Sequence, residues 1–297
     1  MKENYEFKKD IAEGGLTHIH TEMSKDAILR LDEIGEYVAG YLKSEYFVVS
    51  DHLTSPHKEQ RRSESEVREK IEEMLNKVDR YNKSRNRPKC ISGIEANIIS
   101  GAIDIPDVLL EKIDFVIASR HFPWGNEGPS KIAENLISAM RNPNVDVIGH
   151  IDRYVNTHID WDSVFRTAET TNTFIEIGFD ISPAQEILRM MSKYKILYTL
   201  GLDFHTFQGL KRRMPIDSEV ITDFAEAKKI EKSRTPEGAE LRREYLRESV
   251  GFGVLKKLIH LIKQLEANGI STDSIVNTLK LNDFLTLIKK PKRQRTL

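Results

Sequence analysis

Short apolar runs recur through the first two thirds of the chain, and stretches long enough for a helix separate most of them. This spacing predicts seven strands, at residues 16–20, 46–50, 90–96, 115–119, 145–150, 174–178 and 198–203. It predicts helices at residues 25–42, 64–81, 130–140 and 183–193, with Ser24, Ser63 and Ser182 as caps near three of their starts. Strands that alternate with helices favour an α/β fold, either a parallel barrel or a doubly wound sheet.

The pattern changes after the seventh predicted strand. Residues 211–249 carry 19 charged side chains among 39, which predicts a solvated helical insertion. Residues 254–265 regain a helical apolar stripe, so we expect a helix that packs on the main body. No repeat or linker interrupts the chain, and we therefore expect one domain over residues 1–297, ending in a basic tail at 289–297.

Composition narrows the range of functions. The chain has 297 residues, of which 39% are hydrophobic and 31% charged, as in ordinary globular proteins. A formal net charge of −1 provides no general attraction for nucleic acid. The N-terminal residues do not resemble a signal peptide and no apolar run approaches the roughly 20 residues of a membrane span, so we expect a cytoplasmic location. Because Cys90 is the single cysteine, a bound metal would need His and carboxylate ligands.

Histidines and acids fall at or near the ends of the predicted strands. These residues are His18, His20, Asp51, His52, Glu95, His121, His150, Asp203 and His205. In parallel α/β folds the carboxyl ends of the strands meet at one face, so the side chains are expected to converge. Side chains two apart on a strand share a face, which lets His18 and His20 hold one ion. Any one histidine alone is more often a packed or surface residue, but burying the whole set without a common partner would be costly.

The ordered motifs resemble the polymerase and histidinol phosphatase (PHP) superfamily of metal-dependent phosphoesterases. They are His18-Ile19-His20-Thr21, Ser50-Asp51-His52, Gly93-Ile94-Glu95, Ser119-Arg120-His121, Gly149-His150-Ile151-Asp152 and Gly201-Leu202-Asp203-Phe204-His205. The resemblance covers residues 16–205, and residues 275–285 look like the closing helix of the family. It implies a distorted, TIM-like (β/α) barrel of seven strands with C-terminal helices.

The resemblance also implies a trinuclear site with two or three divalent ions of zinc, manganese or iron. The first ion would be held by His18, His20, Glu95 and Asp203. Glu95 would bridge to a second ion held by His121 and His150. The third ion would be held by His52, His205 and Asp26, where several relatives have a histidine in place of Asp26. Alternatively, Asp26 only caps the helix expected to begin near Ser24.

The implied reaction is hydrolysis of a small phosphomonoester by metal-activated hydroxide. Glu95, Asp51 and Asp203 are the predicted catalytic carboxylates, and Asp51 and Asp152 are also expected to orient ligands. Lys25, Arg120 and Arg153 lie beside ligand motifs and are candidates for binding the phosphate. Residues 174–179 lack the Glu-Ile-Asn pattern and the later arginine that we associate with histidinol phosphatases, which weakens histidinol phosphate as the substrate.

Several alternatives stay open at this point. A metal-dependent amidohydrolase also begins with HxH and ends with an aspartate, but it would need a metal-bridging lysine that no strand end supplies. A nuclease or phosphodiesterase would use the same chemistry, although the near-neutral charge argues against nucleic acid. A non-catalytic metal-binding interaction module is a third reading. The sequence leaves open the phosphorylated substrate, the filling of the third site, the formation of a homo-oligomer and the role of residues 211–249.

Overall fold

The protein has a mixed α/β fold with two sheets and helices packed around them. The structure is a computed structural model that describes residues 14–54, 62–84, 88–121, 127–151, 158–178, 185–205, 233, 235–245, 251–289 and 291. Within these residues no helix combines the length and apolar character needed to cross a membrane.

The first sheet has three parallel strands in the order β1 (Gly15–Ile19), β2 (Tyr46–Val49) and β3 (Lys89–Ile91). The second has six, in the order β5 (Ala102–Ile103), β4 (Gly93–Ile99), β6 (Phe115–Ser119), β7 (Val147–Ile148), β8 (Phe174–Gly178) and β9 (Tyr198–Gly201). All neighbours in it are parallel except β4 and β5. Single bridges join Ile19 to Phe204 and Asp51 to Ile94, so the two sheets contact each other at two places.

The predicted strand at residues 90–96 is wrong in one respect, because two strands replace it. β3 pairs with β2, whereas β4 pairs with β6, and the change of partner occurs at Ser92. The Ser92 hydroxyl donates to Asp114 at 2.6 Å, and the Ser92 carbonyl accepts from the backbone N–H of Phe115. At Gly93 an added Cβ atom would lie 2.5 Å from the Val49 carbonyl oxygen, so the chain can cross from one sheet to the other only without a side chain there.

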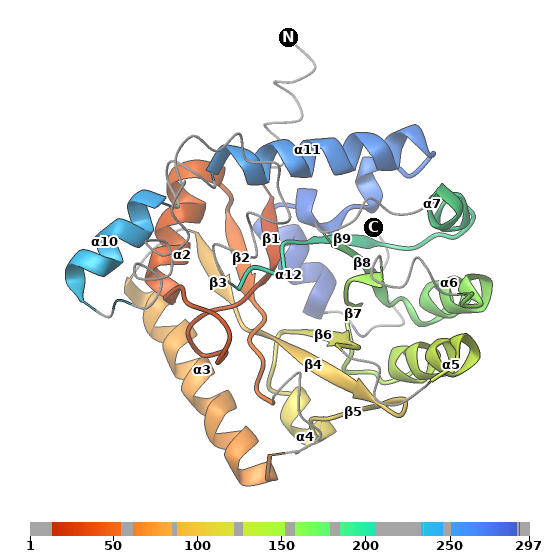
Figure 1. The fold of residues 1–297 in the computed structure, drawn as a ribbon, viewed down its shortest axis with the longest axis horizontal. Helices are drawn as coiled ribbons and strands as arrows, with labels where there is room; N and C mark the ends of the chain where they lie inside the picture. The colour runs from red at the N-terminus through yellow and green to blue at the C-terminus, as the bar shows by residue number, and fades with distance from the viewer. Residues whose placement is uncertain are drawn as a thin grey trace.

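The helices are α2 (Leu31–Tyr37), α3 (Glu64–Ser84), α4 (Asp107–Leu110), α5 (Pro129–Met140), α6 (Trp161–Thr171), α7 (Gln185–Met191), α10 (Pro236–Tyr245), α11 (Gly251–Ala267) and α12 (Leu281–Lys289). Short helical turns η1 (Val38–Leu42), η4 (Thr272–Ser274) and η5 (Val276–Thr278) complete the described elements. Figure 1 shows α5, α6 and α7 on one side of the strands and α2, α3 and α10 on the other, with α12 behind the strands at the centre of the view.

Two predicted helices begin later than expected. The helix predicted at 25–42 starts at Leu31, because residues 21–30 form a turn in which the Ser24 N–H binds Asp51 instead of starting a helix. The closing helix predicted at 275–285 starts at Leu281, and Ile275 instead bridges to Tyr198 of β9. Ser63 lies before α3 as expected and accepts the N–H of Glu66, whereas Ser182 lies outside the described residues.

Aromatic side chains pack together at the amino ends of several strands. Tyr46, Phe115 and Phe174 lie at the amino ends of their strands and pack in one buried cluster with Phe284 of α12. The Tyr46 and Phe284 rings stack with centroids 4.6 Å apart. The buried histidines and Glu95 lie toward the opposite, carboxyl ends of the strands.

Candidate metal centre

The predicted ligands at the strand ends come together in one buried cluster. His18 on β1 and His20 just after it are both fully buried. The ends of β1 and β9 are joined by backbone bonds from Asp203 to His18 and from His20 to Phe204, which brings the two ligand pairs side by side. His150 and Asp203 have positive φ angles of 34° and 44°, a conformation that is uncommon for non-glycine residues.

Glu95 of β4 is at the centre of the cluster and is 0% exposed. Its Oε1 atom lies 2.7 Å from Nε2 of His150 and 3.0 Å from Nε2 of His121. Three further Nε2 atoms lie 3.3 Å from its Oε2 atom, those of His18, His20 and His52. Five imidazoles from four different strand ends therefore surround one carboxylate.

The contacts of Glu95 fit metal ions better than hydrogen bonds. Neither oxygen of the carboxylate takes part in a hydrogen bond of acceptable geometry, although both are buried. A buried carboxylate without hydrogen bonds is strongly unfavourable unless it is paired or binds a metal. Imidazole nitrogens and carboxylate oxygens are suitable ligands for zinc, manganese and iron. The residues present therefore fit divalent cations.

A second carboxylate and a partly exposed third complete the cluster. Asp203 Oδ1 lies 2.9 Å from His205 Nε2, 3.3 Å from His20 Nε2 and 3.7 Å from His18 Nε2. Asp26 Oδ2 lies 3.4 Å from the other ring nitrogen of His205, Nδ1. Because the Asp26 side chain is 36% exposed, it marks the solvent side of the cluster.

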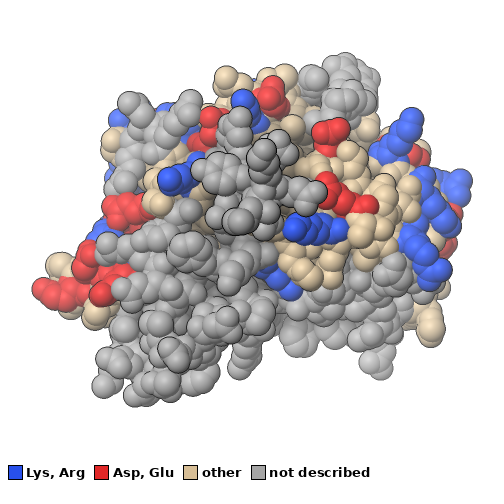
Figure 2. All heavy atoms as spheres, turned by 90° about the horizontal axis from the view of Figure 1, so that it is seen from above, with Lys and Arg blue, Asp and Glu red and all other residues tan. Residues whose placement is uncertain are grey.

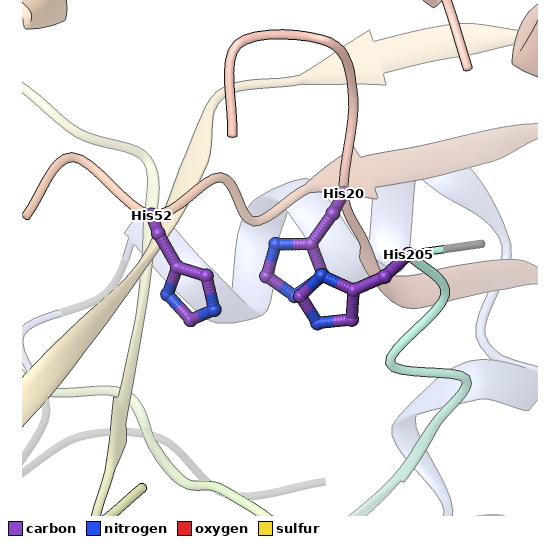
Figure 3. Close-up of side chains that lie close together, drawn as sticks. All are labelled: His20, His52 and His205. Atoms are coloured by element: carbon purple, nitrogen blue, oxygen red, sulfur yellow. The ribbon is translucent and has the colours of Figure 1, made fainter. Parts of the chain in front are cut away.

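Among the residues that the structure describes, three groups could each hold an ion, with ligand atoms within 4.8 Å of one another. They are His20, His52 and His205; His18, Glu95, His150 and Asp203; and His52, Glu95 and His121. This grouping differs from the one that the resemblance implies, because His20 joins the third set and His150 joins the first. His52 belongs to two of the groups, and Asp26 belongs to none of them. Figure 3 shows His20 and His205 with overlapping rings, whose centroids are 3.8 Å apart, and His52 across from them.

The electrostatics of the cluster keep its acids ionised. Burial alone would raise the pKa of Glu95, but the charges of His121, His18 and His150 hold it well below the usual value. Burial likewise opposes the ionised form of Asp203, and hydrogen bonds from His20 and His205 hold its pKa well below the usual value. The carboxylates are thus available as anionic ligands at neutral pH.

Glu176 of β8 contacts two of the candidate ligands, and sequence reasoning did not single it out. Its two oxygens lie 2.8 and 3.0 Å from Nδ1 of His18, and Oε1 accepts the backbone N–H of His150 at 3.1 Å. An added Cβ atom at Gly201 would lie 2.2 Å from the Glu176 carboxyl carbon, so the neighbouring strand makes room for it. The signal was a single acid inside an otherwise apolar strand, since a fully buried carboxylate needs a partner.

Asp51 holds the turn that follows His20. Its Oδ1 atom accepts the backbone N–H groups of Thr21 at 2.6 Å and Ser24 at 3.2 Å, and its Oδ2 atom accepts the Thr21 hydroxyl at 2.8 Å. The Ser24 hydroxyl oxygen in turn accepts the backbone N–H of His52 at 2.7 Å. Asp51 thereby orients the chain between ligands, and its oxygens are directed at the turn.

The candidate phosphate-binding residues differ in their surroundings. Arg120 is 8% exposed and is held by Glu127, at 3.0 Å from Nη2 and 3.2 Å from Nε. Lys25 is exposed in the turn beside Asp26. Arg153 and Asp152 lie outside the described residues.

Comparison with known proteins finds relatives that are named as phosphatases. A probable phosphatase of Caldicellulosiruptor saccharolyticus is 37% identical over 148 residues, which cover 44% of this chain and 59% of that protein. A probable phosphatase of Clostridium botulinum is 34% identical over 128 residues, covering 39% of this chain and 51% of that protein. DNA polymerase/3'-5' exonuclease PolX of Bacillus subtilis is 26% identical over 215 residues, covering 66% of this chain and 35% of that protein. The matches thus span between 35% and 59% of the length of these relatives.

No protein-family model matches the chain. A crystal structure of histidinol phosphate phosphatase from Lactococcus lactis, complexed with zinc, L-histidinol and phosphate, covers 64% of this chain and 86% of that chain. The two structures superpose with a TM-score of 0.47 at 14% sequence identity. The chain is thus similar in sequence to proteins named as phosphatases and to PolX, in agreement with the resemblance of its ordered ligand motifs to the polymerase and histidinol phosphatase superfamily.

Proposed function

We propose that the chain is a metal-dependent phosphoesterase that hydrolyses a small phosphomonoester. The observation that carries this proposal is the buried Glu95 carboxylate with five imidazole nitrogens within 3.3 Å. Relatives named as probable phosphatases support the same class of reaction. The matches span 59% and 51% of those proteins, and the phosphatase activity and the substrate class are therefore both part of what we propose for this chain.

Two or three divalent ions of zinc, manganese or iron would bind in this cluster. The proposed ligands are His18, His20, Asp26, His52, Glu95, His121, His150, Asp203 and His205. Bound ions would supply an activated water and neutralise charge that develops on the phosphoryl oxygens.

Side chains of the protein would hold the ions, orient the ligands and bind the phosphate. Glu95 lies between the imidazoles of several strand ends and would bridge two ions, while Asp203 would bind beside it. The Glu176 carboxylate accepts a hydrogen bond from Nδ1 of His18, and Nε2 of the same ring is then directed at the cluster. Lys25, Arg120 and Arg153 are the proposed contacts of the phosphate, since each lies next to a ligand motif in sequence.

We propose a distorted seven-stranded barrel as the frame of this site. The bridges Ile19–Phe204 and Asp51–Ile94 support closure, because each joins the first sheet to the second. Residues 1–297 would form one domain, with 211–249 as a charged helical insertion and 289–297 as a basic tail. Of this insertion, α10 packs on α2 through Arg242, whose Nη2 atom lies 2.7 Å from Glu33 Oε1.

A phosphatase assay with metal reconstitution tests the proposal. The chelated protein should be inactive on small phosphomonoesters, and manganese or zinc should restore hydrolysis. Glu95→Gln should abolish it, because an amide replaces a carboxylate shared between ions. Glu169→Gln is the control, since Glu169 accepts the backbone N–H of Lys195 and lies outside the cluster. Wild-type kcat in Glu95→Gln would contradict the proposal.

Phosphodiester hydrolysis is the second candidate, because the match to the exonuclease PolX covers 66% of the chain. Figure 2 shows acidic and basic side chains interspersed over the described part of one face, and the net charge is −1. This balance favours a small substrate over a nucleic acid. Faster cleavage of a single-stranded oligonucleotide than of any monoester in the panel would favour the second candidate.

A further inference from the structure

The hairpin formed by β4 and β5 ends beside the candidate ligand His121. Ser100 and Gly101 in its turn have φ angles of 50° and 79°, as a tight hairpin turn requires. The strands pair antiparallel and return the chain, so that the backbone N–H of Asp104 donates to the Asn97 carbonyl at 3.1 Å. The hairpin thus places Asp104 next to Asn97, the second residue after Glu95.

The contacts of the Asn97 amide decide its orientation. Its Nδ2 atom donates to Asp104 Oδ2 at 2.7 Å and to Thr54 Oγ1 at 2.8 Å. The backbone N–H of Asn97 donates to the other oxygen of Asp104 at 2.8 Å, and the Thr54 hydroxyl donates to Oδ2. Because an ionised carboxylate only accepts hydrogen bonds, the nitrogen end of the amide must face it.

The opposite end of the amide meets His121. Asn97 Oδ1 lies 2.8 Å from His121 Nδ1, and this oxygen can only accept. The Nδ1 atom must therefore carry a proton. The other ring nitrogen, Nε2, lies 3.0 Å from Glu95 Oε1 and faces the cluster. An imidazole with its proton on Nδ1 has its lone pair on Nε2, which is the form that binds a metal through Nε2.

We infer that Asn97 is a positioning residue, oriented by Asp104, which holds the proton of His121 on Nδ1 and so directs Nε2 at the ion shared with Glu95. The inference rests on the proposed metal site and adds residues beyond its ligands. Asp104 acts on His121 indirectly, by fixing which end of the Asn97 amide faces the imidazole, and does not itself contact the ring. Loss of such an outer contact typically lowers metal affinity by about 10- to 100-fold.

Asp104→Asn tests this orientation without truncating a side chain. The amide oxygen of the new side chain at position 104 should still accept the backbone N–H of Asn97. The amide nitrogen of the new side chain then faces the side-chain amide of Asn97. Two NH₂ groups cannot bond, and Asn97 should turn its own nitrogen toward His121. We expect zinc affinity at one site to fall about 10- to 100-fold in a chelator competition. In zinc-loaded protein labelled with ¹⁵N-histidine, the protected Nδ1 proton of His121 should disappear, with His121→Gln used for assignment.

The reverse substitution should repair the defect. Adding Asn97→Asp to Asp104→Asn provides a carboxylate that accepts from the new amide and from His121 Nδ1. The double variant should recover the Nδ1 proton signal and most of the lost zinc affinity. A double variant that binds zinc no better than Asp104→Asn would overturn the inference, as would an unchanged Nδ1 proton in Asp104→Asn.

Asn82→Leu is the matched control. The Asn82 side chain makes two hydrogen bonds to backbone, with the N–H and carbonyl of Cys90 at 2.9 and 2.8 Å, and Asn82 lies in the last turn of α3, away from the ligands. The Asn82→Leu variant should keep wild-type zinc affinity. If it lost as much zinc affinity as Asp104→Asn, the effect would not be specific to Asn97 and Asp104, and the inference would be overturned. If Asp104→Asn does not fold, Asn97→Leu decides by the same two measurements, and a retained Nδ1 proton would overturn the inference. Zinc binding without phosphatase activity in the wild type would count against the proposed function alone.

Discussion

Glu176 Oε2 lies 2.8 Å from Nδ1 of His18, while Nε2 of the same ring points at Glu95 Oε2 from 3.3 Å. The two carboxylates, both 0% exposed, therefore hold one imidazole between them from opposite sides. Burial would lower the pKa of His18, but the charges of Glu176 and Glu95 raise it well above the usual value. An outer carboxylate in this position fixes the ring and makes it a more basic ligand.

Glu176→Gln should therefore weaken metal binding without unfolding the protein. The amide oxygen can still accept from His18 Nδ1, but the negative charge is lost. We expect metal affinity to fall about 10- to 100-fold, with a parallel loss of activity at limiting metal. Chelator competition measures the first effect and a metal titration of kcat the second. Glu169→Gln, at an acid that binds the backbone N–H of Lys195, should behave as wild type.

Asp26 should be required for the binding of one of the metal ions. The structure removes the alternative that it caps a helix, since α2 begins only at Leu31. Its Oδ2 atom lies 3.4 Å from His205 Nδ1 and 4.0 Å from His52 Nε2, at the solvent side of the cluster. Elemental analysis should find two or three ions in the wild type and about one fewer in Asp26→Ala. Asp26→His should shift preference from manganese toward zinc, and equal metal content in all three proteins would count against the role.

The metal-free protein should have a stability maximum near about pH 6. The pKa values of Glu95 and Asp203 are held below their usual range. Their contribution to the free energy of unfolding is therefore present above about pH 4 and is lost as the pH falls. Burial would lower the pKa of His205, but hydrogen bonds with Asp203 and Asp26 raise it to about 9. Its contribution is complete below about pH 6.5 and is lost as the pH rises toward 9.

Thermal melts of chelated protein across pH 4 to 10 would measure this profile. Burial also holds the pKa of His52 well below the usual value, which adds to the loss on the acid side. Saturating zinc should flatten the alkaline limb, because metal replaces protons on the imidazoles. A melting temperature of the metal-free protein that rises steadily between about pH 6.5 and 9 would contradict the assignment of His205.

Docking of α10 on α2 depends on a buried ion pair. Arg242 is 2% exposed, and its guanidinium binds both oxygens of the fully buried Glu33 through Nε and Nη2 at 2.7 to 3.2 Å. Arg242→Met should destabilise the protein by about 3–5 kcal/mol, because it leaves Glu33 buried and unpaired. Adding Glu33→Gln should recover part of that loss in urea unfolding. Arg166→Met, at an exposed pair with Asp162, should change stability by less than about 1 kcal/mol.

The sequence by itself determined which residues could be ligands and at which end of the fold they would meet. Alternating strands and helices predict a parallel arrangement, and side chains such as His18 and Asp203 at strand ends must then converge whatever the details of packing. Local patterns of this kind need only the strand period and the direction of the chain. They were sufficient to predict the strands Phe115–Ser119 and Phe174–Gly178 with the bounds that the structure has.

Only the tertiary structure decided how the cluster is held and divided. Glu176 and His18 are 158 positions apart, and Arg242 and Glu33 are 209 apart, so no local pattern relates them. The turn at residues 21–30 takes its shape from Asp51, whose carboxylate competes with helix formation for the backbone N–H groups of Thr21 and Ser24. Buried polar groups need partners with specific geometry, and which partner comes within reach is settled by packing across the whole fold.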